Sequence, residues 1–180
     1  DGRGEYRNPH AAMAMQRLSI IDVHHGWQPL YNEDRSVVLV ANGEIYNYLE
    51  LRKELEGRGH SFRSGSDCEV IPHLYEEFGD KCLQYLRGMF AFALWDEHKK
   101  CLFLARDRMG EKPLYIYEKP GELYFASEFK SVMKAGFVPF NLDPKAIDLY
   151  FHYNFVPEPM TPVQGVRKLP AGHFLKVTVD

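Results

Sequence analysis

The chain has 180 residues, the length of one ordinary domain, which on folding buries about 70% of the surface of the unfolded chain. Its 45% hydrophobic and 26% charged residues are typical of a globular domain and exclude a disordered or fibrous chain. A formal net charge of -3 without a basic run disfavours nucleic-acid binding. The longest apolar run, residues 89–95, is far shorter than the roughly 20 residues that span a bilayer, so no membrane partner is expected.

Cysteine and histidine spacing narrows the chemistry further. The three cysteines, Cys68, Cys82 and Cys101, form no CxxC pair, which favours reduced, buried thiols and a cytoplasmic protein over a disulfide framework. The eight histidines show neither HxxxH spacing nor a cluster with metal-ligand spacing, so the sequence predicts no metal site. The GxGxxG, GxxxxGK[ST] and GxSxG motifs are absent, which removes the common dinucleotide, nucleotide and hydrolase signals.

In the first half of the chain, the apolar pattern predicts two strands and three helices. The strands cover residues 12–21 and 36–41, where apolar residues alternate with polar ones or are β-branched. The helices are expected at residues 47–57, 66–79 and 80–88, each ended by glycine. The expected N-cap of the first helix is Asn47, with Glu50 completing a capping box. The second helix is expected to be capped by Ser66 or Asp67, and the third by Asp80.

The second half begins with two expected hairpins. Residues 89–95 and 101–105 flank a polar turn, but their apolar residues do not alternate with polar ones. A strand that is apolar on both faces must be covered on both, so this hairpin belongs inside a layered structure. The later elements are expected as a hairpin over residues 114–126, helices capped by Ser127 and Asp143, a proline-rich connector over 156–162, and strands between 165 and 179. Together they predict an α+β fold with antiparallel strands.

Asn42 and Gly43 follow the apolar strand over residues 36–41, where an Asn-Gly pair is normally the turn of a two-residue hairpin. The next residues lead into a helix and not into a partner strand. We therefore interpret residues 42–44 as a loop at a sheet edge, which presents an amide, a glycine N–H and the Glu44 carboxylate.

Two charged residues have alternative interpretations. Arg17, inside an expected strand, either points into water or clamps a carboxylate with its planar guanidinium. Asp67 is either a helix cap or the counter-charge of a ligand ammonium, and could be both. An arginine, a carboxylate and an amide/N–H pair together suit an amino acid whose side-chain amide is attacked.

These residues lie in strings that resemble the glutamine amidotransferase domain of asparagine synthetases, a class II (N-terminal nucleophile) glutaminase. The strings are RLSIID (17–22), QPLYNED (28–34), NGEIYNYLELR (42–52), SDCEVI (66–71), LRGMFAFALWD (86–96), LARDRMGEKPLY (104–115) and FASEFK (125–130). They occur in the family's order. The later string GVRKLPAGHFL (165–175) resembles the segment that leads into the ATP-dependent half of such enzymes.

The resemblance implies an α+β fold of the N-terminal nucleophile hydrolase type: a four-layer αββα sandwich of two mainly antiparallel sheets. It implies a glutaminase domain over residues 1–155, followed over 156–180 by a connector and strand pair that lead towards a C-terminal synthetase domain beyond this chain. That synthetase domain would bind ATP and Mg, whereas the glutaminase domain needs no cofactor. L-glutamine and the synthetase domain are the implied partners, and a homodimer is compatible with the resemblance.

The resemblance also implies how glutamine is bound. Arg17 would bind the α-carboxylate of glutamine, and Asp67 and Glu44 would hold its α-ammonium group. Ile20 and Ile21 would present backbone groups at the pocket wall.

For catalysis, the resemblance implies an oxyanion hole made by the side-chain amide of Asn42 and the N–H of Gly43. Donors placed where the oxyanion develops stabilise the transition state more than the substrate. In the complete enzyme a cysteine thiolate attacks the carboxamide, ammonia leaves for the synthetase domain, and water hydrolyses the thioester to glutamate.

The family's nucleophile is a cysteine at the mature N-terminus, and Asp1-Gly2 resembles the end of the RGPD string downstream of it. We therefore expect that the first strand and this cysteine are missing, and that the chain alone is inactive. Cys68 lies beside the pocket motif, but a cysteine at a helix start is more often structural. Glu111 and Pro72 also depart from the family's pattern.

Two other interpretations remain open at this point. A relative that has lost the cysteine would be a non-catalytic scaffold that docks a synthetase half, although the intact set of pocket residues argues against it. Another class II amidotransferase, of a sugar-phosphate or phosphoribosyl type, fits the strings less well. The ammonia acceptor, aspartate or another carboxylate, is not encoded in these residues.

Overall fold

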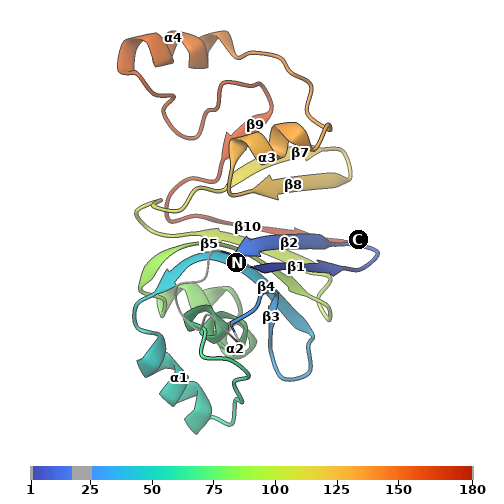
Figure 1. Cartoon of the computed structure of the whole chain (residues 1–180), viewed down its shortest axis with the longest axis vertical. Coiled ribbons are helices and arrows are strands. Elements are labelled where there is room, and N and C mark those ends of the chain that lie inside the picture. The colour runs from blue at the N-terminus through green and yellow to red at the C-terminus, as the bar shows by residue number, and fades with distance from the viewer. Residues whose placement is uncertain (1, 18–25, 180) are drawn as a thin grey trace. The chain divides into compact units, whose positions relative to one another are not determined.

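The computed structural model describes residues 2–17 and 26–179 and divides into two compact units (Figure 1). Unit 1 comprises residues 1–105 and 174–180, and unit 2 comprises residues 106–173. Within the described residues, no helix combines the length and apolar character that a membrane crossing requires.

Unit 1 is built on a five-stranded sheet with the strand order β10-β6-β5-β4-β3 (Figure 1). The strands are β3 (Leu30–Tyr31), β4 (Val37–Ile45), β5 (Gly88–Asp96), β6 (Cys101–Arg106) and β10 (Phe174–Thr178). β4 and β5 pair antiparallel along their whole length, from Val37 opposite Asp96 to Ile45 opposite Gly88. This long pair forms the centre of the sheet and carries the candidate site.

The central strands are buried on both faces, as their apolar sequence predicted. On one face Leu39 and Phe92 join the main core with side chains of α1 (Tyr48–Gly57) and α2 (Val70–Phe78). On the other face Val38 and Trp95 are also buried. The hairpin of β1 (Gly2–Arg7) and β2 (Ala12–Arg17) packs there, since β2 contacts β4 and the ring of His10 stacks on that of Trp95 at 6.4 Å. β1 is a strand that the sequence pattern did not predict.

The helices of unit 1 differ from the expectation in their caps and in the third helix. Asn47 is the N-cap residue of α1, but its side chain makes no capping bond. It instead accepts a bond from the Arg87 N–H and donates one to the Tyr85 carbonyl, which ties α1 to the segment before β5. The expected third helix is the 3-10 helix η2 (Gly79–Gln84), because Gly79 breaks α2 with a φ of 59° and leaves only a short segment before β5.

Unit 2 contains a three-stranded sheet with the order β8-β7-β9 and two helices. Its elements are β7 (Tyr115–Lys119), β8 (Glu122–Ala126), α3 (Phe129–Lys134), α4 (Pro144–Tyr153) and β9 (Val166–Lys168). Asp143 caps α4 as predicted, accepting bonds from two backbone N–H groups, whereas the N-cap residue of α3 is Glu128 and not Ser127. The two strands expected near the end are present, but β9 pairs with β7 and β10 pairs with β6.

Candidate functional site

Asn42, Gly43 and Glu44 lie in strand β4, so the prediction that they form a loop was wrong. They pair in register with Ala91, Phe90 and Met89 of β5. Because the apolar strand β5 offers a full-length partner, tertiary pairing overrides the local turn preference of the Asn-Gly pair. Alternation along the strand places Asn42 and Glu44 on one face and Gly43 on the face that carries α1 and α2.

Two side chains bind the edge of β4 that faces away from β5. Gln28 bonds both backbone groups of Ala41: its Oε1 accepts from the Ala41 N–H at 2.7 Å and its Nε2 donates to the Ala41 carbonyl at 2.8 Å. Asp67 Oδ2 accepts from the Ile45 N–H at 2.7 Å. N–H groups of alternate residues point to the same side of a strand, so the Gly43 N–H points to this edge, between the two bound positions.

The Gly43 N–H is a donor that the strand itself does not use. Strand β3 covers this edge only opposite Val38 and Leu39. Within residues 2–17 and 26–179, no acceptor bonds the Gly43 N–H. The edge of β4 therefore presents one backbone donor, held in position by bonded neighbours on both sides.

Glycine is required at position 43 by close packing. A Cβ there would lie 2.1 Å from the Met89 carbonyl oxygen and 2.6 Å from the Phe90 Cα, and the φ of the residue is +155°. Both neighbours are backbone atoms of β5, which cannot move without disturbing the strand pair. A side chain at this position would thus shift the donor N–H.

Asp67 begins the 3-10 helix η1 (Asp67–Glu69), which runs directly into α2. Asp67 is 5% exposed, and its side chain does not cap the helix but anchors β4 through Ile45. Within the described residues, Asp67 Oδ1 accepts no hydrogen bond, so half of this buried carboxylate is uncommitted. The neighbouring Glu69, also buried, holds the preceding loop by accepting from the backbone N–H groups of Arg63 and Ser64.

Arg17 is the last residue of β2, where its backbone pairs with Gly2. Since β2 packs against β4, the strand that ends in Arg17 adjoins the strand that carries Asn42. The Arg17 side chain, Ile20 and Ile21 lie outside the described part of the structure. The roles predicted for these three residues remain predictions.

The three cysteines are free and buried. The Cys68 Sγ lies 4.0 Å from the Gly43 carbonyl oxygen and 3.8 Å from Asp67 Oδ2, both of which are acceptors. A thiol between two acceptors is placed to donate its proton. Burial raises the pKa of the Cys82 thiol to about 12, and burial also raises the pKa of Cys101. A high pKa disfavours the nucleophilic thiolate at both positions.

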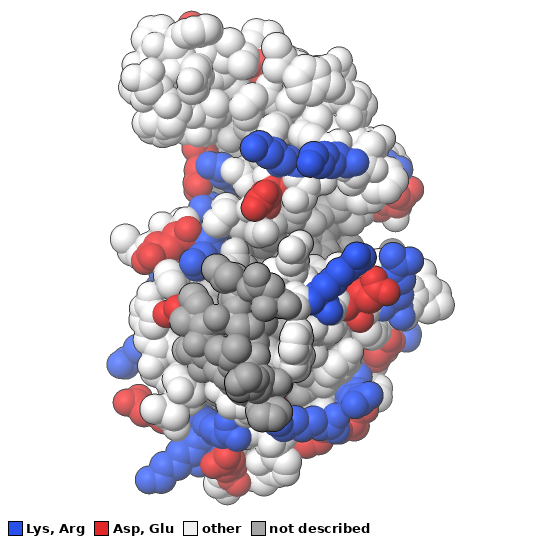
Figure 2. All heavy atoms as spheres, in the orientation of Figure 1, with Lys and Arg blue, Asp and Glu red and all other residues white. Residues whose placement is uncertain are grey.

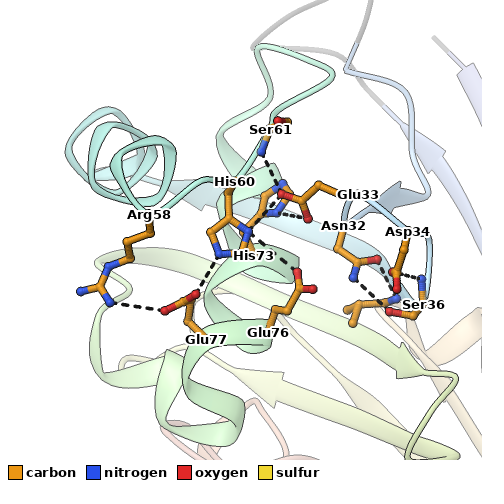
Figure 3. A network of polar contacts seen from close by, with 11 residues as sticks. Asn32, Glu33, Asp34, Ser36, Arg58, His60, Ser61, His73, Glu76 and Glu77 are labelled. Carbon is orange, nitrogen blue, oxygen red and sulfur yellow. Dashed lines mark hydrogen bonds and ion pairs between the residues drawn. The ribbon is translucent and has the colours of Figure 1, made fainter.

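Sequence reasoning missed two groups of residues. One is Gln28, which has no signal of its own, because nothing in the sequence shows that its amide substitutes for a strand partner of Ala41. A second group of polar side chains lies where the β3–β4 connection, the segment after α1 and α2 meet, and comes from three segments far apart in the sequence: Glu33, His60, His73, Glu76 and Glu77 (Figure 3). The spacing of these residues along the chain gave no signal of a cluster.

Comparisons with known proteins agree with this architecture. The whole chain, residues 1–180, matches the glutamine amidotransferase domain family. Among solved structures, the glutamine phosphoribosylpyrophosphate amidotransferase of B. subtilis, complexed with ADP and GMP, superposes with a TM-score of 0.58. It is 28% identical in sequence, and the match covers 69% of this chain and 29% of that chain. A structure described as the allosteric regulatory enzyme of purine biosynthesis gives a TM-score of 0.52 at 30% identity, covering 61% of this chain and 25% of that chain.

Curated relatives are more similar. Asparagine synthetase [glutamine-hydrolyzing] 1 of Bacillus subtilis is 42% identical over 180 residues, which is 100% of this chain and 28% of the relative. Asparagine synthetase B of Escherichia coli is 49% identical over 134 residues, 74% of this chain and 24% of the relative. The chain thus spans less than a third of the length of these relatives. The α+β fold with antiparallel sheets is confirmed, and the chain belongs to the glutamine amidotransferase domain family, in the form found in asparagine synthetases.

Proposed function

We propose that this domain hydrolyses glutamine to glutamate and ammonia, and that the ammonia serves an ATP-dependent synthetase domain of the same protein. The observation that supports this most strongly is the Gly43 N–H at the edge of β4, held between the Gln28 and Asp67 contacts. A fixed backbone donor beside a side-chain amide, that of Asn42, is the arrangement that an oxyanion hole requires.

Glutamine would lie along this edge with its α-amino end towards Asp67. The uncommitted oxygen of this buried carboxylate suits an ammonium group, because a buried charge needs an opposite charge or hydrogen bonds. Glu44 would assist, and Arg17 would clamp the α-carboxylate in a bidentate pair. Ile20 and Ile21 would line the same pocket through their backbone groups.

The attacking thiolate would come from a cysteine outside residues 1–180, because Cys68 is buried and placed to donate its proton. We therefore propose that the 180-residue chain alone binds glutamine without turning it over. Glutamine hydrolysis in this domain would need no cofactor, and ATP and Mg would bind to the synthetase domain.

A partner domain is supported by the surface around α4. Four large aromatic side chains of this segment are exposed: Tyr150, Phe151, Tyr153 and Phe155. In Figure 2 the region that carries α4 shows few charged side chains, whereas charges of both signs are mixed over the rest of this face. Exposed apolar surface of this kind is typical of a face that another domain covers. We propose the synthetase domain as that partner and a homodimer as the assembly. The proposed compartment is the cytoplasm, because its reducing conditions keep the three thiols free.

Glutamine binding, measured by titration calorimetry, tests the proposal without needing the nucleophile. The comparison is between the wild-type chain, Arg17→Ala, Asp67→Ala and the control Arg7→Ala, which removes an exposed arginine from the same hairpin. Charge-assisted hydrogen bonds contribute about 1.5–3 kcal/mol, so each pocket variant is expected to lose at least about tenfold in affinity. Arg7→Ala should bind like the wild type.

The same titration with a chain extended upstream to include a cysteine separates two failures. Binding that appears only in the extended chain would show that the upstream strand completes the pocket. Absence of binding in both chains would overturn the proposal in favour of a scaffold domain. Equal affinities of Arg17→Ala and Arg7→Ala would refute the role of Arg17.

A further inference from the structure

His73 on α2 is the most unusual polar side chain of unit 1. It is completely buried, and within the described residues neither of its ring nitrogens makes a hydrogen bond. A carboxylate oxygen, Glu33 Oε2, lies 3.3 Å from His73 Nδ1. A buried imidazole without a hydrogen bond costs free energy unless another ligand satisfies it.

Three further side chains lie around the ring of His73. Glu33 comes from the β3–β4 connection, His60 from the segment after α1, and Glu76 from the next turn of α2 (Figure 3). The four potential ligand atoms, one from each residue, all lie within 4.8 Å of one another. We propose that Glu33, His60, His73 and Glu76 bind one divalent transition-metal ion, with zinc as the preferred metal.

The spacing of these atoms fits a single tetrahedral ion. Ligand atoms about 2.0–2.1 Å from one zinc ion are about 3.3–3.5 Å apart in a tetrahedron. His73 Nδ1 lies 3.3 Å from Glu33 Oε2, while His60 Nδ1 lies 3.0 Å from the other oxygen of that carboxylate, Oε1, and 3.9 Å from Glu76 Oε2. A tetrahedral site takes one ligand atom from each residue, and the four candidate atoms already lie within 4.8 Å of one another, so side-chain movements would bring them to these separations.

The orientation of His60 is also that of a metal ligand. Its Nδ1 faces Glu33 and Glu76, while its Nε2 lies 3.2 Å from Glu77 Oε1 on the opposite side. A histidine that binds a metal through one nitrogen usually donates the other N–H to a carboxylate, which fixes the ring and raises its basicity. Glu77 is in turn paired with Arg58 at 3.3 Å, so the supporting carboxylate is held in place.

The charges of the cluster favour a cation. Two carboxylates, Glu33 and Glu76, share this small volume with two imidazoles. Two imidazoles and two carboxylates form a ligand set that suits zinc, whereas calcium and magnesium prefer oxygen alone. The bound ion would link the β3–β4 connection, the end of α1 and α2. Its role is structural, and no step of the proposed glutamine chemistry passes through it.

The test measures metal binding by the metal-free 180-residue chain. Cobalt(II) is added as a spectroscopic probe, and zinc affinity follows from competition with a chromophoric chelator. We expect one ion per chain, the intense visible absorption of tetrahedral cobalt, and a thermal midpoint at least about 5 °C higher at saturating zinc. His60→Gln and Glu76→Gln should each lower zinc affinity at least about tenfold. Glu76 is the most exposed of the four side chains, so Glu76→Gln is expected to fold even if the more buried His60 tolerates substitution less well.

The matched control is His98→Gln. His98 pairs with the carboxylate of Asp34 at 3.7 Å on the surface, with both side chains largely exposed, and it lies outside the cluster. This control should bind zinc like the wild type. Binding below one ion per chain, or equal zinc affinities for His60→Gln, Glu76→Gln and His98→Gln, would overturn the proposal and leave the cluster as a hydrogen-bonded network only. Circular dichroism of the metal-free variants verifies that a lost affinity is not a lost fold.

Discussion

Gly43→Ala is the substitution that most directly tests how the candidate site is built. The added Cβ would lie 2.1 Å from the Met89 carbonyl oxygen, well inside any contact that real Cβ atoms make. Because the obstructing atoms belong to the backbone of β5, the change cannot be absorbed by rotating a side chain. The strands β4 and β5 must separate locally, and this happens at the centre of the main sheet of unit 1.

Two effects set the magnitude. Overpacking a well-packed interior costs typically about 1–3 kcal/mol. A non-glycine residue in a region of φ/ψ space that essentially only glycine adopts costs on the order of 1–3 kcal/mol. The two costs overlap, because relaxing the strand relieves part of both, so we expect a loss of about 2–4 kcal/mol in the free energy of unfolding. For a chain of this size that lowers the thermal midpoint by roughly 4–16 °C.

Thermal and urea unfolding of the wild type, Gly43→Ala and Gly57→Ala measure this effect. Gly57 is the last residue of α1, and a Cβ there meets no atom within 4 Å. Alanine at this position should leave stability unchanged or raise it by up to about 1 kcal/mol. If the free energy of unfolding of Gly43→Ala lies within about 1 kcal/mol of the wild-type value, the close approach of β4 and β5 is not what fixes the position of the Gly43 N–H.

Three further substitutions have expected outcomes. Hydrogen bonds, the strongest of them from Lys100, lower the pKa of Glu97 to about 2 in the folded chain. The ionised Glu97 therefore stabilises the fold above the unfolded pKa of about 4.3, and this contribution is lost as the pH falls towards 2. Glu97→Gln should therefore be less stable by up to about 1 kcal/mol at pH 7 and no less stable than the wild type near pH 2, as urea unfolding at both pH values would show. Arg106 is 5% exposed and forms a bidentate pair with Glu158, which lysine cannot reproduce. Arg106→Lys is therefore expected to lower the free energy of unfolding in urea by about 2 kcal/mol or more, and a loss below about 0.5 kcal/mol would contradict this. Asp143→Ala removes the cap of α4 and should cost about 1 kcal/mol, measured by circular dichroism melting, with Asp148→Ala on the exposed face of α4 as the control.

The sequence predicted most elements because their local signals agree with their tertiary surroundings. The doubly apolar hairpin over residues 89–105 required cover on both faces, and the structure supplies it. The cap at Asp143 was predicted for the same reason, since proline follows it directly. β1 was missed because its residues, GRGEYR, carry no run of apolar or β-branched side chains. It is a strand because β2 pairs with it along its whole length.

The candidate site was harder to predict than the fold. The residue types Asn42, Gly43 and Asp67 were identified, but their setting was not, because an Asn-Gly pair signals a turn when no partner strand is in view. The sequence alone could not show that Gln28 and Asp67 both bond the edge of β4. These contacts join residues far apart in the chain, and no regular sequence spacing predicts them. The cluster around His73 was missed for the same reason.

The two proposals meet on one continuous helical segment. Asp67 starts η1, and η1 continues without a break into α2, which carries His73 and Glu76. An ion that fixes α2 to the β3–β4 connection would also restrict the position of the Asp67 carboxylate, which anchors Ile45 at 2.7 Å. The two sites nevertheless use different atoms. Loss of zinc in Glu76→Gln is therefore expected to weaken glutamine binding less than Asp67→Ala does, since Glu76→Gln leaves the Asp67–Ile45 hydrogen bond intact.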